Sequence, residues 1–104
     1  MEVKDFQKKS AEVVFKLDKK FSVNRTEQMA LSQLLEELGE LAKEVNRPAL
    51  RNQQFNREAL EDEFADTTLQ LVALAEKLNI DIEKAVKNKI KTLAERNKID
   101  LPFA

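Results

Sequence analysis

Apolar side chains between residues 30 and 45 recur every three or four positions, which is the spacing of a helix rather than of a strand. At about 100° of rotation per residue they fill one continuous arc of about 140°. Such an arc is typical of an amphipathic helix that packs with one face against the rest of the protein. The residues that form it are Ala30, Leu31, Leu34, Leu35, Leu38, Leu41, Ala42 and Val45.

The remainder of the chain is also helical in character, and no segment shows the convincing alternation of a strand. Phe6, Val13, Val14 and Leu17 give the first segment an apolar side. The third segment is apolar nearly all round in its second half, which is typical of a helix buried on more than one side. We therefore predict four helices, over residues 3–20, 27–46, 57–78 and 82–96.

Capping residues support the predicted helix starts. Side-chain oxygens of Asn, Thr and Asp can accept a hydrogen bond from the first free N–H groups of a helix. The candidate caps are Asn24 or Thr26 for the second helix, Asn56 for the third and Asp81 for the fourth.

The predicted helix ends depend on two other residues. The second helix must end before Pro48, because the residue before a proline disfavours helical geometry. Residues 46–56 follow as the longest irregular stretch. Asn79 can provide a left-handed turn after the third helix.

Long helices joined by short connections predict an all-α fold, a four-helix antiparallel bundle formed by one domain over residues 1–104. The third helix has apolar residues on two sides, and one four-helix chain cannot easily cover both. We therefore expect a homodimer or homotetramer. The two sides consist of Leu69, Val72 and Ala73, and of Leu60, Leu71 and Leu78.

Absent residue types exclude several kinds of chemistry. The chain has no cysteine and no histidine, and it has only one glycine. Disulfides, thiolate or imidazole metal sites, cysteine nucleophiles and Ser-His-Asp triads are therefore excluded. One glycine cannot form a glycine-rich phosphate loop. An enzyme of this composition must use carboxylates, amines, hydroxyls and a metal that prefers oxygen ligands.

Charge and hydropathy restrict the partners. The net charge of −1 gives no overall basic field that would favour a nucleic acid polymer or an anionic membrane. No apolar run approaches the roughly 20 residues that span a bilayer. The N-terminus lacks the apolar core of a signal peptide. We expect a cytoplasmic protein that binds neither a nucleic acid polymer nor a membrane.

Acidic residues follow the apolar faces of two helices. Glu37, Glu40 and Glu44 lie within about 60° of each other along one border of the apolar arc. Glu63 and Asp66 are three residues apart on a largely apolar face of the third helix. Unpaired carboxylates buried there would cost several kcal/mol.

Antiparallel packing of these two helices would bring an E-x-x-E pair and an E-x-x-D pair together. Carboxylate oxygens suit hard cations such as Mg²⁺ or Mn²⁺, which usually also bind substrate phosphates. A ferritin-like di-iron site is excluded because it needs Glu-x-x-His. The alternative is a non-catalytic helical oligomerisation or regulatory module in which the acids only solvate the helix faces.

The segments "EELGELAKE" (36–44) and "EDEFADTTLQLVALAEKL" (61–78) carry a resemblance to a known family. Together they resemble the MazG-like branch of the all-α NTP pyrophosphohydrolases, over about residues 26–97. That resemblance implies a Mg²⁺-dependent enzyme, with Mn²⁺ as a substitute, that hydrolyses a nucleoside triphosphate to the monophosphate and pyrophosphate. It also implies a dimer or tetramer.

The resemblance implies roles for particular residues. Glu37, Glu40, Glu63 and Asp66 would ligate the metal, and Glu36 or Glu37 would activate water. Lys89 stands where such sequences carry a fourth-helix lysine that binds the substrate. Further candidates for phosphate binding are Lys43, Lys91 and Arg96.

The chain also departs from the family. No tyrosine follows the fourth helix, and Gln70 stands where cytosine-selective relatives carry an aromatic residue. Base stacking would fall to Phe21 or Phe55. Phosphoribosyl-ATP pyrophosphohydrolase, a sister activity, usually has histidines after its second motif and is therefore disfavoured. Gly39 lies near the far edge of the apolar arc, where we expect another helix to approach closely.

Overall fold

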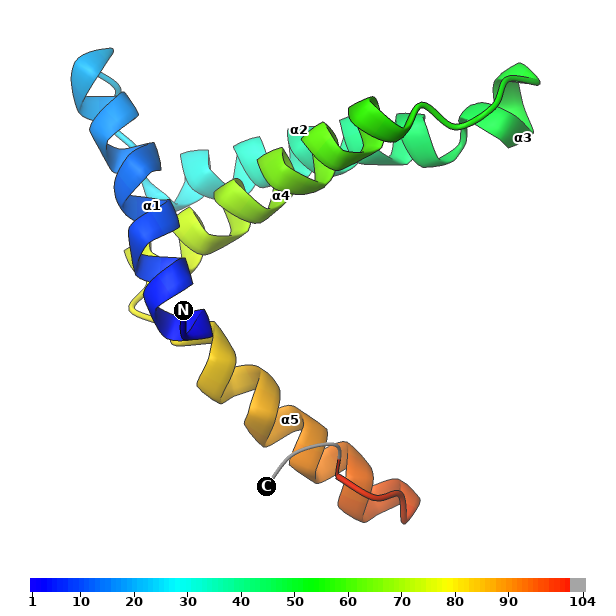
Figure 1. Ribbon diagram of the computed structural model, residues 1–104. Helices are drawn as coiled ribbons and strands as arrows, with labels where there is room; N and C mark the ends of the chain where they lie inside the picture. Colours follow the sequence, from blue (N-terminus) through cyan, green and yellow to red (C-terminus); the bar gives the residue numbers. More distant parts are fainter. Residues whose placement is uncertain (102–104) are drawn as a thin grey trace.

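The computed structural model describes residues 1–101 and contains, over that range, five α-helices and no strand (Figure 1). The helices are α1 Val3–Lys20, α2 Glu27–Val45, α3 Arg47–Arg51, α4 Arg57–Lys77 and α5 Ile82–Asn97. The predicted all-α class is confirmed. The four predicted helices correspond to α1, α2, α4 and α5, with ends that differ by at most one residue.

Side-chain caps start three of the helices as predicted. Thr26, rather than Asn24, accepts a hydrogen bond from the backbone N–H of Met29 at 3.1 Å. Asn56 and Asp81 accept equivalent bonds at the starts of α4 and α5, each at 3.1 Å. Caps of this kind stabilise a helix by about 1 kcal/mol each. Asn79 adopts the predicted left-handed conformation, with φ of 56°.

The predicted irregular stretch after α2 contains a helix, so that part of the prediction is wrong. α3 follows α2 almost directly and has Pro48 in its first turn, where the missing N–H is not needed for a helical hydrogen bond. Glu44, at the end of α2, accepts two hydrogen bonds from Arg47, at 2.6 and 3.0 Å. This ion pair bridges the break between the two helices.

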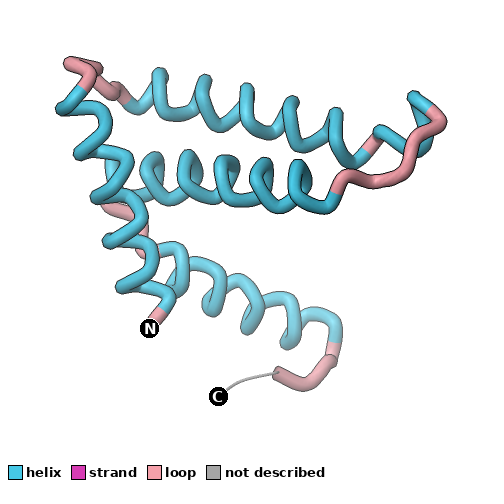
Figure 2. The backbone as a smooth tube through the Cα atoms, turned by 45° about the horizontal axis from the view of Figure 1, so that its top comes forward, coloured by secondary structure: helices cyan, strands magenta, loops and turns pink. Residues whose placement is uncertain are grey.

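α2 and α4 lie side by side and antiparallel, and α1 packs across one end of the pair, against α4 (Figures 1 and 2). α5 extends away from this pair, so one chain does not close into the predicted four-helix bundle. The radius of gyration is 16.6 Å, against about 13 Å for a compact domain of about 100 residues. Within the described part of one chain, no other helix covers the faces of α4 and α5 that point away from α1 and α2.

Small residues dominate the core of the single chain. Its buried apolar residues are five alanines and two valines, and no large side chain is fully buried within the described range. Val72 and Ala73 are buried, whereas Leu71 and Leu78, on the other side of α4, are 45% and 50% exposed. Within residues 1–101, no helix combines the length and hydrophobicity required to cross a bilayer.

A buried glutamine fixes the point from which α5 departs. Gln7 of α1 is only 3% exposed. Its amide nitrogen donates to Glu76 at 2.8 Å and to the carbonyl of Ile80 at 2.7 Å. Its amide oxygen accepts from the N–H of Ile82 at 3.0 Å. The connection between α4 and α5 is thereby held against α1.

Candidate metal and nucleotide site

Three carboxylates meet where α2 and α4 pack together. Oxygens of Glu37, Glu63 and Asp66 all lie within 4.8 Å of one another. Glu63 and Asp66 share a face of α4 because residues three apart are neighbours on a helix. The antiparallel packing of α2 supplies Glu37. We call these three residues the carboxylate cluster.

The environment of the carboxylate cluster disfavours negative charge. Burial raises the pKa of Glu37, and the nearby charges of Asp66 and Glu63 raise it further. Burial likewise raises the pKa of Glu63, followed by the charge of Asp66 and then that of Glu40. The pKa of Asp66 is raised by burial and by the charge of Asp62. The ionised form of all three acids is therefore disfavoured, and a bound cation would remove that cost.

Unsatisfied oxygens in the same region support a cation site. Oε2 of Glu63 is buried and accepts no hydrogen bond within residues 1–101, and the hydroxyl of Thr67, one turn further along α4, is also buried without a partner. A carboxylate oxygen without a partner is unfavourable unless a cation or water meets it. Three convergent carboxylates are a donor set suited to Mg²⁺ or Mn²⁺. The residues present therefore fit a hard divalent cation.

The other acids singled out in the sequence lie outside the carboxylate cluster. Glu40 is exposed and lies outside the three-residue group, although its charge acts on both Glu37 and Glu63. Glu36, a candidate water-activating residue, is exposed on α2. Glu44 belongs to the Arg47 ion pair at the end of α2.

The predicted phosphate-binding cations do not gather at the carboxylate cluster within one chain. Lys43 is exposed near the end of α2. Lys89, Lys91 and Arg96 are exposed on α5, which extends away from α2 and α4 (Figure 1).

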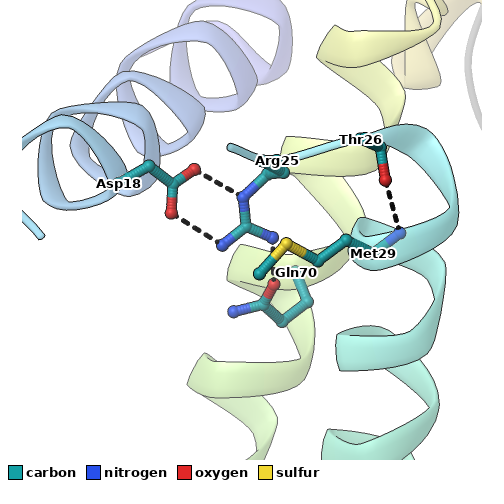
Figure 3. Close-up of polar contacts among 5 residues, drawn as sticks. All are labelled: Asp18, Arg25, Thr26, Met29 and Gln70. Carbon is teal, nitrogen blue, oxygen red and sulfur yellow. Dashed lines mark hydrogen bonds and ion pairs between the residues drawn. The ribbon is translucent and has the colours of Figure 1, made fainter. Parts of the chain in front are cut away.

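One arginine near the cluster was not anticipated from the sequence. Arg25, in the connection between α1 and α2, is 7% exposed. Its Nε and Nη2 donate to the two carboxylate oxygens of Asp18 at 2.6 and 3.1 Å, and its Nη1 donates to Oε1 of Gln70 at 2.9 Å (Figure 3). Asp18 and Gln70 are 7 and 45 residues away in sequence, so no helical spacing rule would have paired them.

A cavity of about 260 Å³ connects this arginine to the carboxylate cluster. Glu37 and Asp66 contribute to one part of its wall, and Arg25 and Gln70 to another. The remaining lining residues are Val14, Leu17, Asp18 and Leu69. The carboxylates therefore adjoin a partly apolar space with its own polar groups.

The comparison with protein families agrees with this geometry. The family model of the MazG nucleotide pyrophosphohydrolase domain matches residues 25–99, which include both acidic motifs and the helices that carry them. No curated protein and no solved structure gave a significant match. The match spans most of the chain, and the chain therefore belongs to the MazG nucleotide pyrophosphohydrolase domain family.

Proposed function

We propose that this protein is a divalent-metal-dependent pyrophosphohydrolase that converts a nucleoside or deoxynucleoside triphosphate and one water into the monophosphate and pyrophosphate. The observation that carries the proposal is the convergence of Glu37, Glu63 and Asp66 beside a cavity. Membership of the MazG family gives the reaction class. The physiological cation is Mg²⁺, and Mn²⁺ can replace it.

Each acid has a proposed part in this reaction. Glu37, Glu63 and Asp66, with Glu40 from the next turn of α2, would hold the cation. The cation would neutralise phosphate charge and lower the pKa of a water molecule. Glu36 or Glu37 would accept the proton of the attacking water. For Glu37 its place in the carboxylate cluster, on the wall of the cavity, supports that role, because a base must lie beside the water that it deprotonates.

Phosphate charge also has to be balanced by side-chain cations. Lys43 is available on α2, and Lys89, Lys91 and Arg96 are available on α5. We propose that α5 packs against a second copy of the chain in a homodimer or homotetramer, and that its cations reach a site across that interface. The extended chain and the exposed Leu71 and Leu78 support this assembly.

Hydrolysis of a panel of NTPs and dNTPs, with Mg²⁺ or with EDTA, tests the proposal. We expect metal-dependent turnover that Glu63→Gln and Asp66→Asn each reduce by at least about 100-fold, because each removes a ligand charge. Far-UV circular dichroism should show unchanged helicity. Full activity of both variants would contradict the assigned site, and a protein that turns over no nucleotide would be the non-catalytic module.

The proposed assembly has its own measurement. Light scattering at micromolar concentration should give two or four times the mass of one chain. Leu71→Glu should lower that value, because it places a charge on an apolar surface that is 45% exposed in the single chain. A wild-type protein of single-chain mass would contradict the assembly.

A further inference from the structure

The cavity beside the carboxylate cluster measures about 260 Å³ and opens to solvent. Its aliphatic lining, from Val14, Leu17 and Leu69, is suited to the faces of a flat heterocycle. Its polar groups lie on Arg25, Gln70 and Asp18, whose two oxygens both accept from Arg25, and on the two acids of the carboxylate cluster. The cavity is therefore suited to one end of a nucleotide whose phosphates lie at the cation.

Gln70 is held in one orientation by its neighbour. An arginine side chain has five N–H donors and no acceptor. Gln70 must therefore turn its amide oxygen, and not its nitrogen, towards Arg25, and Nη1 donates to that oxygen at 2.9 Å. Asp18 fixes the guanidinium in turn through two further bonds. Figure 3 shows the Gln70 nitrogen on the side away from Arg25.

The Gln70 amide oxygen is thus turned towards Arg25, and the group that the side chain presents on the side away from Arg25 is its nitrogen, a donor. Its nitrogen makes no hydrogen bond among residues 1–101. Three N–H groups of Arg25 are engaged by Asp18 and Gln70, and the other two can also only donate. A carbonyl group placed here would accept a hydrogen bond. An amino group would leave two donors facing each other, which is costly in a partly buried site.

The spacing along α4 is consistent with one bound nucleotide. Gln70 lies four residues after Asp66, so the two share a face of the helix about 6 Å apart along its axis. A sugar can bridge that separation between a base at Gln70 and a phosphate at the cation.

We propose that the cavity receives the base of the substrate and that Gln70, oriented by the Asp18–Arg25 pair, selects bases with a carbonyl group over bases with an amino group at the corresponding edge. This inference rests on the proposed pyrophosphohydrolase function. The favoured bases are uracil, thymine, hypoxanthine and guanine, and the disfavoured ones are cytosine and adenine. Gln70 is thus a specificity-determining residue, and Arg25 is a positioning residue.

Matched substrate pairs test the inference. The pairs dUTP with dCTP, and ITP with ATP, each exchange a carbonyl for an amino group at one edge. With Mg²⁺, the wild-type kcat/KM should favour the carbonyl member of each pair by at least about fivefold.

Two variants at the same position sharpen the test. Gln70→Glu retains an acceptor for Arg25 but replaces the outward donor with an acceptor, so the order within each pair should reverse. Gln70→Leu removes the donor, so both ratios should approach one. Gln54→Glu makes the same charge change at an exposed residue in the connection before α4 and should keep the wild-type ratios.

The outcomes separate this inference from the function on which it rests. Equal kcat/KM within the wild-type pairs, or an unchanged order in Gln70→Glu, would overturn the inference and leave the pyrophosphohydrolase proposal standing. Absence of turnover for every nucleotide would overturn both.

Discussion

Glu37 of α2 and Asp66 of α4 hold carboxylate oxygens within 4.8 Å of each other, although both acids are partly buried. Two like charges at this separation repel, and burial adds to the cost of keeping both ionised. The fold therefore maintains an arrangement that is unfavourable in the absence of a cation. Such an arrangement can be tested through stability as well as through catalysis.

The first prediction is that a divalent cation stabilises the folded protein. Mg²⁺ at about 100 times its dissociation constant should add about 2.7 kcal/mol to the free energy of unfolding. Differential scanning calorimetry should show this as a rise in Tm. Asp66→Asn should lose most of the rise, whereas Asp100→Asn, the same change at an exposed residue beyond α5, should retain it. A wild-type Tm that Mg²⁺ and Mn²⁺ leave unchanged would exclude the cation site.

The second prediction concerns pH in the presence of a chelator. Folding raises the pKa of Glu37 and Glu63 above the ordinary 4.5, and that of Asp66 above 3.8. Acids of this kind destabilise the folded state when ionised, so Tm should rise as the pH falls from neutral through their raised pKa values. The lowered pKa values of Glu44 and Glu83 have the opposite effect, which grows as the pH falls through the ordinary value of 4.5 towards their lowered values.

Thermal unfolding between pH 7.5 and 5 in EDTA measures this dependence. The Asp66→Asn variant should show a smaller rise than the wild type, since it removes one of the three acids. Identical pH profiles for the two proteins would contradict the electrostatic coupling within the carboxylate cluster.

The third prediction compares a buried ion pair with an exposed one. The side chains of Arg25 and Asp18 are 6% and 13% exposed. Asp18→Ala leaves the guanidinium without its partner and should lower the free energy of unfolding by about 3–5 kcal/mol. Glu12→Ala breaks the Lys16–Glu12 pair, whose side chains are 74% and 60% exposed, and should cost less than about 1 kcal/mol. Urea denaturation measures both, and equal costs would contradict the structural role of Arg25.

The fourth prediction concerns Gly39, where the structure differs from the sequence-based expectation. A Cβ added at Gly39 meets no atom within 4 Å among the described residues, so no helix of the same chain approaches it closely. Gly39→Ala should then stabilise the protein by about 0.5–1 kcal/mol through helix propensity. Chemical denaturation measures this change. A destabilised variant would instead indicate that a second copy of the chain packs against this position.

Local signals made the helices and the meeting of the acids predictable. The side chains of Asn56 and Asp81 cap the helices that follow them, so these residues indicate where the helices start. The three-residue spacing of Glu63 and Asp66 places both acids on one face of a helix. α3 is not predicted from the sequence pattern because Pro48 indicates the end of one helix and is equally tolerated in the first turn of the next.

Long-range contacts between polar residues were not predictable in this way. Gln7 directs the start of α5 through partners more than 65 residues away, yet as a polar residue it does not contribute to an apolar periodicity. Arg25 likewise pairs with Gln70 across 45 residues. Such contacts depend on how α1 crosses α4, which single-helix patterns do not determine.

Identification of the products is the most direct test of the proposed chemistry. Phosphorus-31 NMR of a nucleoside triphosphate incubated with the protein and Mg²⁺ resolves pyrophosphate from orthophosphate and from the nucleotide phosphates. The proposed function predicts equal amounts of monophosphate and pyrophosphate, with formation abolished by EDTA. Nucleoside diphosphate with orthophosphate, or an unchanged spectrum for every nucleotide, would contradict it.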